Sequence, residues 1–196
     1  MGILKGKAVW IIALAVLGIY GCSSYNSMAK AEQSVKEQWA NVENSYQSRM
    51  DKTKNLLAIV QKAANFEKGT LTEVIEARSK ATSVNIDANN LTPENIQKFQ
   101  AAQDQFGQSL GRLMVVVEKY PELKSVDAFR DFQTQYEGIE NRISTERKRY
   151  NEEVGTFNKS IVTFPKSLMA KMFGYKEFSY FKAAAGADTA PDINGM

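Results

Sequence analysis

Few side chains in this sequence are of the types that carry out chemistry. Among its 196 residues there is no histidine, and there is a single cysteine, Cys22. Histidine is the commonest general base near neutral pH, and histidine and cysteine are the commonest zinc ligands, so the usual acid–base and zinc centres lack a key residue. The remaining candidates are Cys22 and the carboxylates and arginines of the predicted helices. We expect no catalytic residue, cofactor or metal site.

Cys22 directly follows an apolar segment, and Ile19-Tyr20-Gly21-Cys22 resembles a bacterial lipobox. In that motif an aliphatic residue and, nearer the cysteine, a small residue precede a cysteine that becomes diacylated and then forms the N-terminus. Ile19 and Gly21 fit, whereas Tyr20 stands where a small or aliphatic residue is usual. Two interpretations stay open: lipid attachment at Cys22, or an uncleaved signal anchor in which Cys22 is a bystander at the membrane face.

Arginine and glutamate residues interrupt or flank the apolar faces of the predicted helices. A charge near a bundle interior is costly unless it is paired, and arginine can bind a carboxylate through two hydrogen bonds. We therefore expect a structural polar network that fixes the helices in place, in which Arg49 and Arg78 pair with Glu118 or Glu140. A di-metal carboxylate site inside a bundle normally needs Glu-x-x-His ligands, which a chain without histidine cannot supply.

The charge of the chain does not point to nucleic acid. The sequence has 25 lysines and arginines and 22 carboxylates, and removing Lys5 and Lys7 leaves 23 against 22. The densest basic cluster, Arg147-Lys148-Arg149, stands directly after Glu146. This mixture is typical of a solvated helix face and not of a basic groove with stacking aromatic residues. We expect no nucleic-acid partner.

Residues 1–21 have the parts of a secretory signal. Lys5 and Lys7 precede an apolar run of 13 residues from Ala8 to Tyr20. This run is short for a free-standing transmembrane helix, which needs about 20 apolar residues. The lysines favour a cytoplasmic N-terminus and export of everything after Cys22. We expect residues 1–21 to be a signal peptide or signal anchor, and the protein to be held on a membrane.

A long helix is predicted from Ala29 to Phe66, a stretch without proline or glycine. Its apolar residues recur at steps of three and four, which places them on one helix face, whereas a strand would need steps of two. A helix of this length would be roughly 57 Å long, so the bundle must be elongated. The same heptad-like pattern would also support a homo-oligomer. The face consists of Val35, Trp39, Val42, Tyr46, Met50, Thr53, Leu57, Val60 and Ala64.

A short second helix is predicted over residues 71–81. Gly69 is expected to cap the C-terminal end of the first helix, and Thr70 to start the second. Residues 82–92 are rich in Asn, Asp, Ser and Thr and have no period, so we expect a loop or mobile segment there.

The third helix has a strong start signal, with Thr92 as N-cap and Pro93 in the first turn, and its apolar face runs to Pro121. Gly107 and Gly111 lie four residues apart within it and would allow another helix to approach closely.

A fourth helix is predicted over residues 127–163, with one or two further turns over 166–173. The aromatic residues that follow either pack on the bundle end or form an exposed docking patch. Residues 183–196 have almost nothing to bury and are expected to be disordered. The aromatic residues are Tyr175, Phe178, Tyr180 and Phe181.

A series of short motifs runs along most of the chain. They are Tyr25-Asn26, Trp39, Tyr46-Gln47-Ser48-Arg49-Met50-Asp51, Ala77-Arg78, Glu118-Lys119-Tyr120-Pro121-Glu122-Leu123-Lys124, Glu140-Asn141-Arg142-Ile143, Arg149-Tyr150-Asn151, Phe157-Asn158 and Phe164-Pro165. In these motifs the sequence resembles the LemA family of bacterial envelope proteins. The resemblance implies an N-terminal membrane helix followed by an exported, elongated, all-helical bundle, and it transfers no catalytic residue. A cysteine at the end of the membrane segment is similar to a variant found in part of the family.

The expected fold is therefore all-α: an elongated antiparallel bundle of three long helices and one short one over residues 22–182, behind the membrane segment. The expected role is a membrane-tethered, exported scaffold or adaptor of the bacterial cell envelope that binds an envelope protein and has no catalytic activity of its own. Two alternatives are a regulator or accessory subunit of an envelope enzyme, and a lipid-binding protein that remodels membranes.

Overall fold

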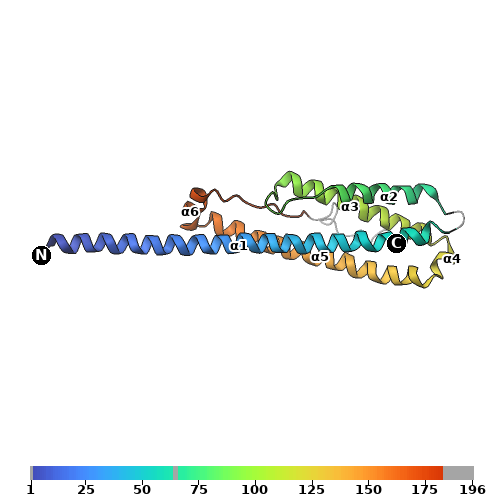
Figure 1. The fold of residues 1–196 in the computed structure, drawn as a ribbon, viewed down its shortest axis with the longest axis horizontal. Helices are drawn as coiled ribbons and strands as arrows, with labels where there is room; N and C mark the ends of the chain where they lie inside the picture. Colours follow the sequence, from blue (N-terminus) through green and yellow to red (C-terminus); the bar gives the residue numbers. More distant parts are fainter. Residues whose placement is uncertain (1, 64–65, 183–196) are drawn as a thin grey trace, which may run out of the picture.

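The structure is a computed structural model that describes residues 2–63 and 66–182. Within these residues the chain forms helices and no strand, which confirms the predicted all-α fold (Figure 1). Ala64 and the predicted disordered tail, residues 183–196, lie outside the described residues. The helices are α1 (Gly2–Val60), α2 (Lys68–Ser83), α3 (Pro93–Val117), α4 (Pro121–Lys124), α5 (Asp127–Val162) and α6 (Lys166–Phe173).

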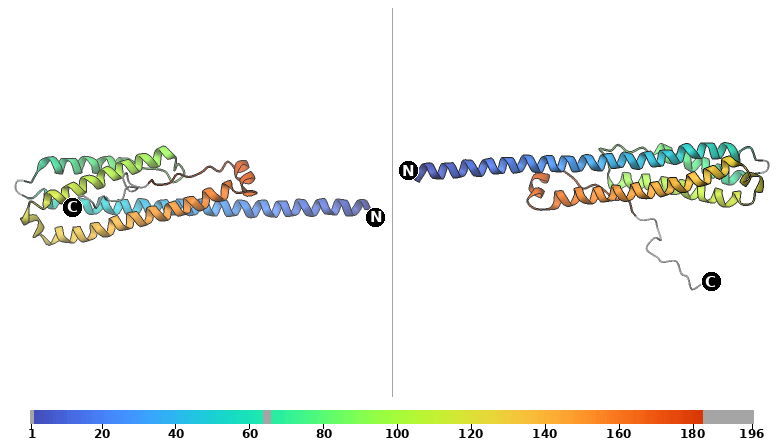
Figure 2. Two further views of the ribbon diagram at one scale, coloured as in Figure 1. Left: turned by 180° about the vertical axis from the view of Figure 1, so that it is seen from behind. Right: turned by 90° about the horizontal axis from the view of Figure 1, so that it is seen from below.

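The bundle is elongated and is built on one antiparallel pair of helices. α1 and α5 lie side by side, and the pair of α2 and α3 covers the half of them that is distant from the N-terminus (Figures 1 and 2). The corner helix α4 joins α3 to α5 at one end, which we call the far end. The N-terminal part of α1 protrudes from the opposite end, beside α6, and we call this the exit end.

α1 is a single helix of 59 residues that joins two very different environments. All described residues of its predicted apolar face, from Val35 to Val60, are buried in the bundle. The apolar residues before the bundle are open to the surroundings: Val9 is 64% and Ile19 72% exposed. The helix continues through Cys22 without a break. The described chain therefore has one helix long and apolar enough to cross a membrane, a property that signal sequences share.

The first helix ends earlier than predicted. Turns over residues 61–63 close α1 after Val60. The chain leaves the helix there and buries Phe66, whose ring centroid lies 4.9 Å from that of Tyr120 at the far end. Burial of an aromatic ring thus outweighs one further turn of helix.

The connections on either side of α2 also differ from the sequence-based expectation. Gly69 and Thr70 do not mark a boundary, since α2 begins at Lys68. Residues 84–92 form a loop, as predicted, but Ile86 and Leu91 are buried in the core and hold it against the bundle. The start of α3 is as predicted: the Thr92 side chain accepts a hydrogen bond from the Asn95 main-chain N–H at 3.3 Å.

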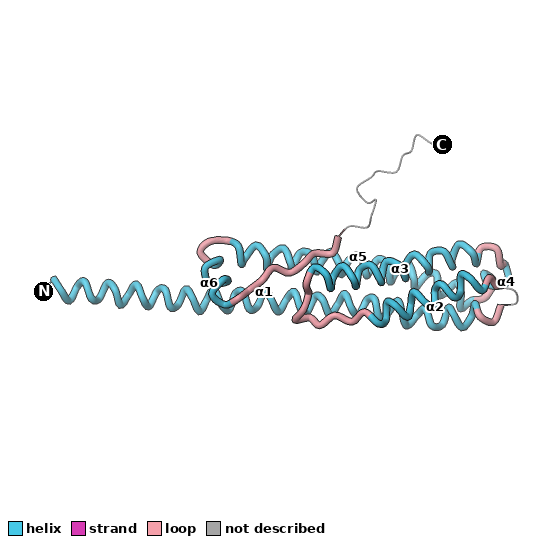
Figure 3. Tube along the Cα trace, turned by 90° about the horizontal axis from the view of Figure 1, so that it is seen from above, coloured by secondary structure: helices cyan, strands magenta, loops and turns pink. Residues whose placement is uncertain are grey.

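Residues 175–182 form an extended segment that we call the strap. It leaves α6 after Gly174, whose φ of 74° suits the left-handed end of a helix. The strap then runs back along the side of the bundle and away from the exit end (Figure 3). Phe181 is 5% exposed, stacks on Trp39 at 5.9 Å and touches Tyr150 edge-on at 5.3 Å. The strap therefore completes the core along the side of the bundle and not at its end.

We predict that Phe181→Ala lowers the free energy of unfolding by about 3 kcal/mol, because it removes a buried ring from a cluster of aromatic side chains. Urea denaturation followed by circular dichroism measures the change. Tyr180→Ala is the matched control, since Tyr180 is 47% exposed, and it should cost no more than about 1 kcal/mol. Equal losses in the two variants would show that the strap does not contribute to the core.

Candidate functional site

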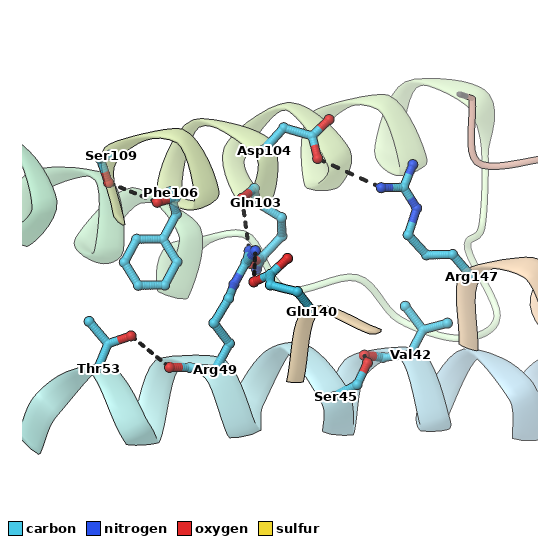
Figure 4. A network of polar contacts seen from close by, with 10 residues as sticks. All are labelled: Val42, Ser45, Arg49, Thr53, Gln103, Asp104, Phe106, Ser109, Glu140 and Arg147. Carbon is cyan, nitrogen blue, oxygen red and sulfur yellow. Dashed lines mark hydrogen bonds and ion pairs between the residues drawn. The ribbon is translucent and has the colours of Figure 1, made fainter. Parts of the chain in front are cut away.

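The residues singled out from the sequence lie in two places: a buried polar layer in the middle of the bundle, and the exit end. The layer is centred on Arg49 of α1, whose side chain is 4% exposed. Its Nη2 donates to the main-chain oxygen and to the side-chain Oε1 of Gln103 on α3, both at 2.8 Å. Its Nη1 donates to Oε1 of Glu140 on α5 at 3.1 Å (Figure 4). One guanidinium therefore joins three helices.

Two aromatic rings hold the guanidinium from its sides. The Arg49 Cζ lies 5.0 Å from the ring centroid of Tyr46 and 5.2 Å from that of Phe106. These distances are in the range of cation–π contacts, which gain strength where water is excluded. Among the described residues, Arg49 Nε has no hydrogen-bond partner although it is buried. The site thus satisfies most, but not all, of the donors of a charge that cannot be neutralised.

The polar layer separates two apolar cores. The core on the exit side contains Tyr46 and Phe99, and the core on the far side contains Met50 and Phe106. Arg49 lies between Tyr46 and Met50 in the chain, where the apolar face of α1 passes from one core to the other. Any shift of α1 along its neighbours would move the charge into one of these cores, so the layer fixes how the helices are aligned.

The layer reaches solvent at Glu140, whose side chain is 37% exposed. Next to it, the pKa of Tyr136 is raised to about 12, chiefly by burial and then by the negative charge of Glu140, while Arg49 acts in the opposite direction. Burial likewise raises the pKa of Tyr46. Neither phenol can serve as a base near neutral pH, so the chemistry of the layer is fixed charge and hydrogen bonding.

Two residues of the predicted network are not part of this layer. Arg78 donates from Nε to the main-chain oxygen of Met50 at 3.4 Å, and no described ion pair joins it to Glu118 or Glu140. Glu118 lies exposed near the far end and pairs with Lys124 at 2.5 Å. The structure therefore brings Arg49 and Glu140 together and leaves Arg78 and Glu118 apart. The sequence spacing could not reveal this, because α2 and the far end pack against different neighbours.

The glycine pair of α3 has a role that differs from the predicted helix contact. A Cβ atom on Gly107 would lie 3.1 Å from Arg49 Nη1, whereas one on Gly111 would meet nothing within 4 Å. Gly107 therefore makes room for a side chain, the guanidinium, and not for the backbone of another helix. Gly111 has no such constraint.

Side-chain amides that the sequence analysis left unassigned hold the strap. Asn158 donates to the main-chain oxygen of Phe178 and accepts from its N–H, both at 2.9 Å. Asn151 pairs in the same way with Phe181, at 3.0 and 2.9 Å. Gln100 of α3 pairs likewise with Lys182, at 3.0 and 3.2 Å. Each side-chain amide thus forms with the strap the pair of N–H and C=O hydrogen bonds that a neighbouring strand would form in a sheet.

The spacing of the two asparagines matches the spacing of their partners. Seven residues of helix from Asn151 to Asn158 rise about 10.5 Å, and three residues of extended chain from Phe178 to Phe181 span about 10 Å. The signal was present in the sequence as two asparagines on one helix face, followed by two phenylalanines three residues apart. This spacing predicts the pairing only once the strap is known to run antiparallel to α5.

The exit end contains the predicted lipid-attachment residue. Cys22 is a free, exposed thiol on the surface of α1. Together with Leu17 and Gly21 it faces Met169 and Phe173 of α6 across an apolar groove of about 600 Å³. Cys22 is thus accessible to modification. Among the described residues no three His, Cys, Asp or Glu side chains gather as a metal site, and the expected lack of a cofactor and of catalysis stays a prediction.

We predict that Arg49→Ala lowers the free energy of unfolding by about 2–4 kcal/mol, since it opens a cavity and leaves the Gln103 side-chain oxygen unpaired in the interior. Arg49→Met leaves the same oxygen unpaired but fills the space with an apolar side chain, so it should recover about 1 kcal/mol or more of that loss. Urea denaturation measures both. Arg142→Ala, at an exposed position on α5, is the control. Equal losses for the Ala and Met variants would mean that the hydrogen bonds themselves, and not the filled space, dominate.

We also predict different results for two glycine substitutions in α3. Gly111→Ala should stabilise the protein by about 0.5–1 kcal/mol through helix propensity alone. Gly107→Ala should lose that gain or destabilise, because its Cβ approaches the guanidinium. Thermal melts of the two variants, repeated in an Arg49→Met background, test the cause. If Gly107→Ala remains unfavourable without the guanidinium, the close approach to Arg49 is not the reason.

Comparison with known proteins agrees with the sequence motifs. Residues 38–194 match the LemA family. Magnetosome protein MamQ 2 of Paramagnetospirillum magneticum is 39% identical over 84 residues, which are 43% of this chain and 31% of that protein. Magnetosome protein MamQ of Magnetospirillum gryphiswaldense is 34% identical over 84 residues, with the same shares of the two chains. The chain spans about a third of the length of these curated relatives.

The family match covers the buried polar layer, α2 to α6 and the strap, and among the described residues it leaves out the protruding part of α1 and the first turns of its bundle part. Most of the bundle described above therefore belongs to the matched region. On this evidence the chain belongs to the LemA family.

Proposed function

We propose that this protein is an exported scaffold or adaptor of the bacterial cell envelope, tethered to a membrane through its N-terminal end and without catalytic activity of its own. The observation that carries the proposal is the continuity of α1, which runs unbroken from the apolar segment into the bundle core. The family match and the apolar helix support membrane association. Lys5 and Lys7 before the apolar run favour export of the bundle.

Continuity of the helix has a mechanical consequence. A flexible linker would let a tethered domain point in any direction, whereas a helix holds it at a defined angle and height. The 38 residues after Cys22 extend about 57 Å along α1. A binding surface at the far end would therefore be held at that distance from the membrane, which suits a protein that positions a partner.

The anchor itself has two forms, and the proposal holds for both. If Cys22 is diacylated, the acyl chains enter the bilayer at that residue, each methylene contributing about 0.8 kcal/mol to anchoring. If the chain is uncleaved, the apolar run of α1 remains in the bilayer and Cys22 lies at its surface. Intact-mass measurement of the membrane-extracted protein distinguishes the forms: one loses residues 1–21 and gains acyl mass, and the other retains full length.

The α2–α3 pair offers the partner surface that we favour. It covers only one side of the α1–α5 pair (Figure 2), and it exposes two apolar side chains, Val115 at 69% and Ile75 at 42%. Isolated exposed apolar residues are common on protein surfaces, so these positions serve as probes of the surface and do not by themselves define a site.

Photo-crosslinking in cells tests the proposal. We expect benzoylphenylalanine at Val115 or Ile75 of the full chain to give discrete adducts with an envelope protein, and the exposed position Lys148 on α5 to give few. The adducts should weaken several-fold when residues 1–21 are replaced by a cleavable signal and Cys22 is changed to Ser, because the partner then meets an untethered bundle. Adducts that are independent of the tether, or absent from every exposed helix face, would overturn the adaptor role.

A further inference from the structure

Exposed apolar side chains gather at the exit end of the bundle. They lie at the end of α5, on the turn that follows it and on α6, and they are more open to solvent than is usual for residues of their size. Leu168 and Met172, one helical turn apart, form the outer side of α6, while Ala170 on its inner side is buried. The set is Val162 at 59%, Phe164 at 76%, Leu168 at 62%, Met172 at 68% and Phe173 at 48% exposed.

These residues lie at the level where α1 leaves the bundle. A Cβ on Gly21 would be 3.3 Å from Met169 Cε, and the rings of Tyr25 and Phe173 are 4.9 Å apart. The helix α6 crosses the end of the bundle, so its axis lies across the direction of α1 (Figures 1 and 3). If α1 stands upright on a membrane, α6 lies parallel to the surface, as amphipathic interfacial helices do.

The end of the apolar run places that surface at the same level. The run from Ala8 to Tyr20 spans about 20 Å of helix, and the long side chains of Lys5 and Lys7 before it can extend toward the headgroups. The run ends next to Gly21, which lies against Met169, and therefore ends where α6 begins. In the lipid-anchored form, the acyl chains on Cys22 enter the bilayer next to Gly21, so the membrane surface again lies at the level of α6. Both forms of the anchor put the exposed apolar side chains of α6 against lipid.

Along the sequence, α6 and its flanks carry lysines as their only charged residues, while Glu32 of α1 and Glu177 of the strap line the pocket beside Phe173. Between Glu153 and Glu177 the sequence has four lysines, Lys159, Lys166, Lys171 and Lys176, and no carboxylate. Lys166 also donates from Nζ to Ser27 Oγ at 3.0 Å, which links α6 to α1. Lysines that flank an apolar face favour the anionic headgroups of a membrane, at about 1 kcal/mol for each lysine near the surface.

We propose that α6 and the turn before it form a second membrane contact, in which Phe164, Leu168 and Met172 enter the boundary between headgroups and acyl chains and the lysines bind anionic phospholipid. The proposal rests on the membrane tether proposed above and adds an interfacial site to it. With two contacts, the bundle can neither tilt freely nor rotate about α1. The far end then faces a fixed direction relative to the membrane.

Quenching of tryptophan fluorescence by brominated phospholipid tests the contact in the full chain. Every chain carries Cys22→Ser, so that it stays uncleaved, and is reconstituted into vesicles of phosphatidylcholine and phosphatidylglycerol. Trp10 reports the tether, and Trp39, which is fully buried in the bundle, is the common background. In a Trp10→Phe chain, Leu168→Trp reports α6, and Val115→Trp, equally exposed but near the far end, is the matched control.

We expect Leu168→Trp to be quenched several-fold more strongly than Val115→Trp by bromine near the headgroups. Changing Lys166 and Lys171 to Glu in the same chain should remove most of the difference. Quenching of Trp10 but not of Leu168→Trp would overturn the second contact while the tether stands. Unquenched Trp10 would overturn the tether and the contact together. Protection of Leu168→Trp that depends on protein concentration would assign the face to a second copy of the chain instead.

Discussion

A single buried positive charge governs how the bundle is assembled. The Arg49 guanidinium finds its hydrogen-bond partners between α3 and α5, at Gln103 and Glu140. Apolar packing alone would tolerate helices that slide past one another by a turn, because apolar residues at steps of three and four give each turn of the helix a similar apolar face. A charge that must keep its partners does not tolerate this. The layer therefore selects one alignment of α1, α3 and α5.

The same helix that carries this charge also protrudes from the bundle. Because α1 is continuous, the alignment set at Arg49 is transmitted to the exit end, where Gly21 meets Met169 of α6. A helix is stiff over this distance, so the position of α6 relative to the apolar segment follows from contacts made several turns away. The hydrogen bonds of the polar layer thus help to fix the position of α6 at the exit end. The strap also connects the two regions, because it runs from α6 back along α5.

Much of the fold was predictable because it depends on local spacing. The buried face of α1, the Thr92 cap and the extent of α5 follow from periodicity and capping chemistry, which act within a few residues. The site was predictable only in part. Arg49 and Glu140 are 91 residues apart in the chain, and charge alone could not choose between Glu140 and Glu118 as the partner. The early end of α1, the space at Gly107 and the amide pairs of the strap depend on tertiary contacts, which no local pattern encodes.

The strap is hydrogen-bonded through its main chain, and this constrains its length. Asn151 and Asn158 pair with peptide groups of the strap, so these bonds do not depend on which side chains the strap carries. The interval between the two amides on α5 matches the three residues that separate Phe178 from Phe181. A single insertion or deletion between these two residues would therefore break a pairing that a substitution leaves intact.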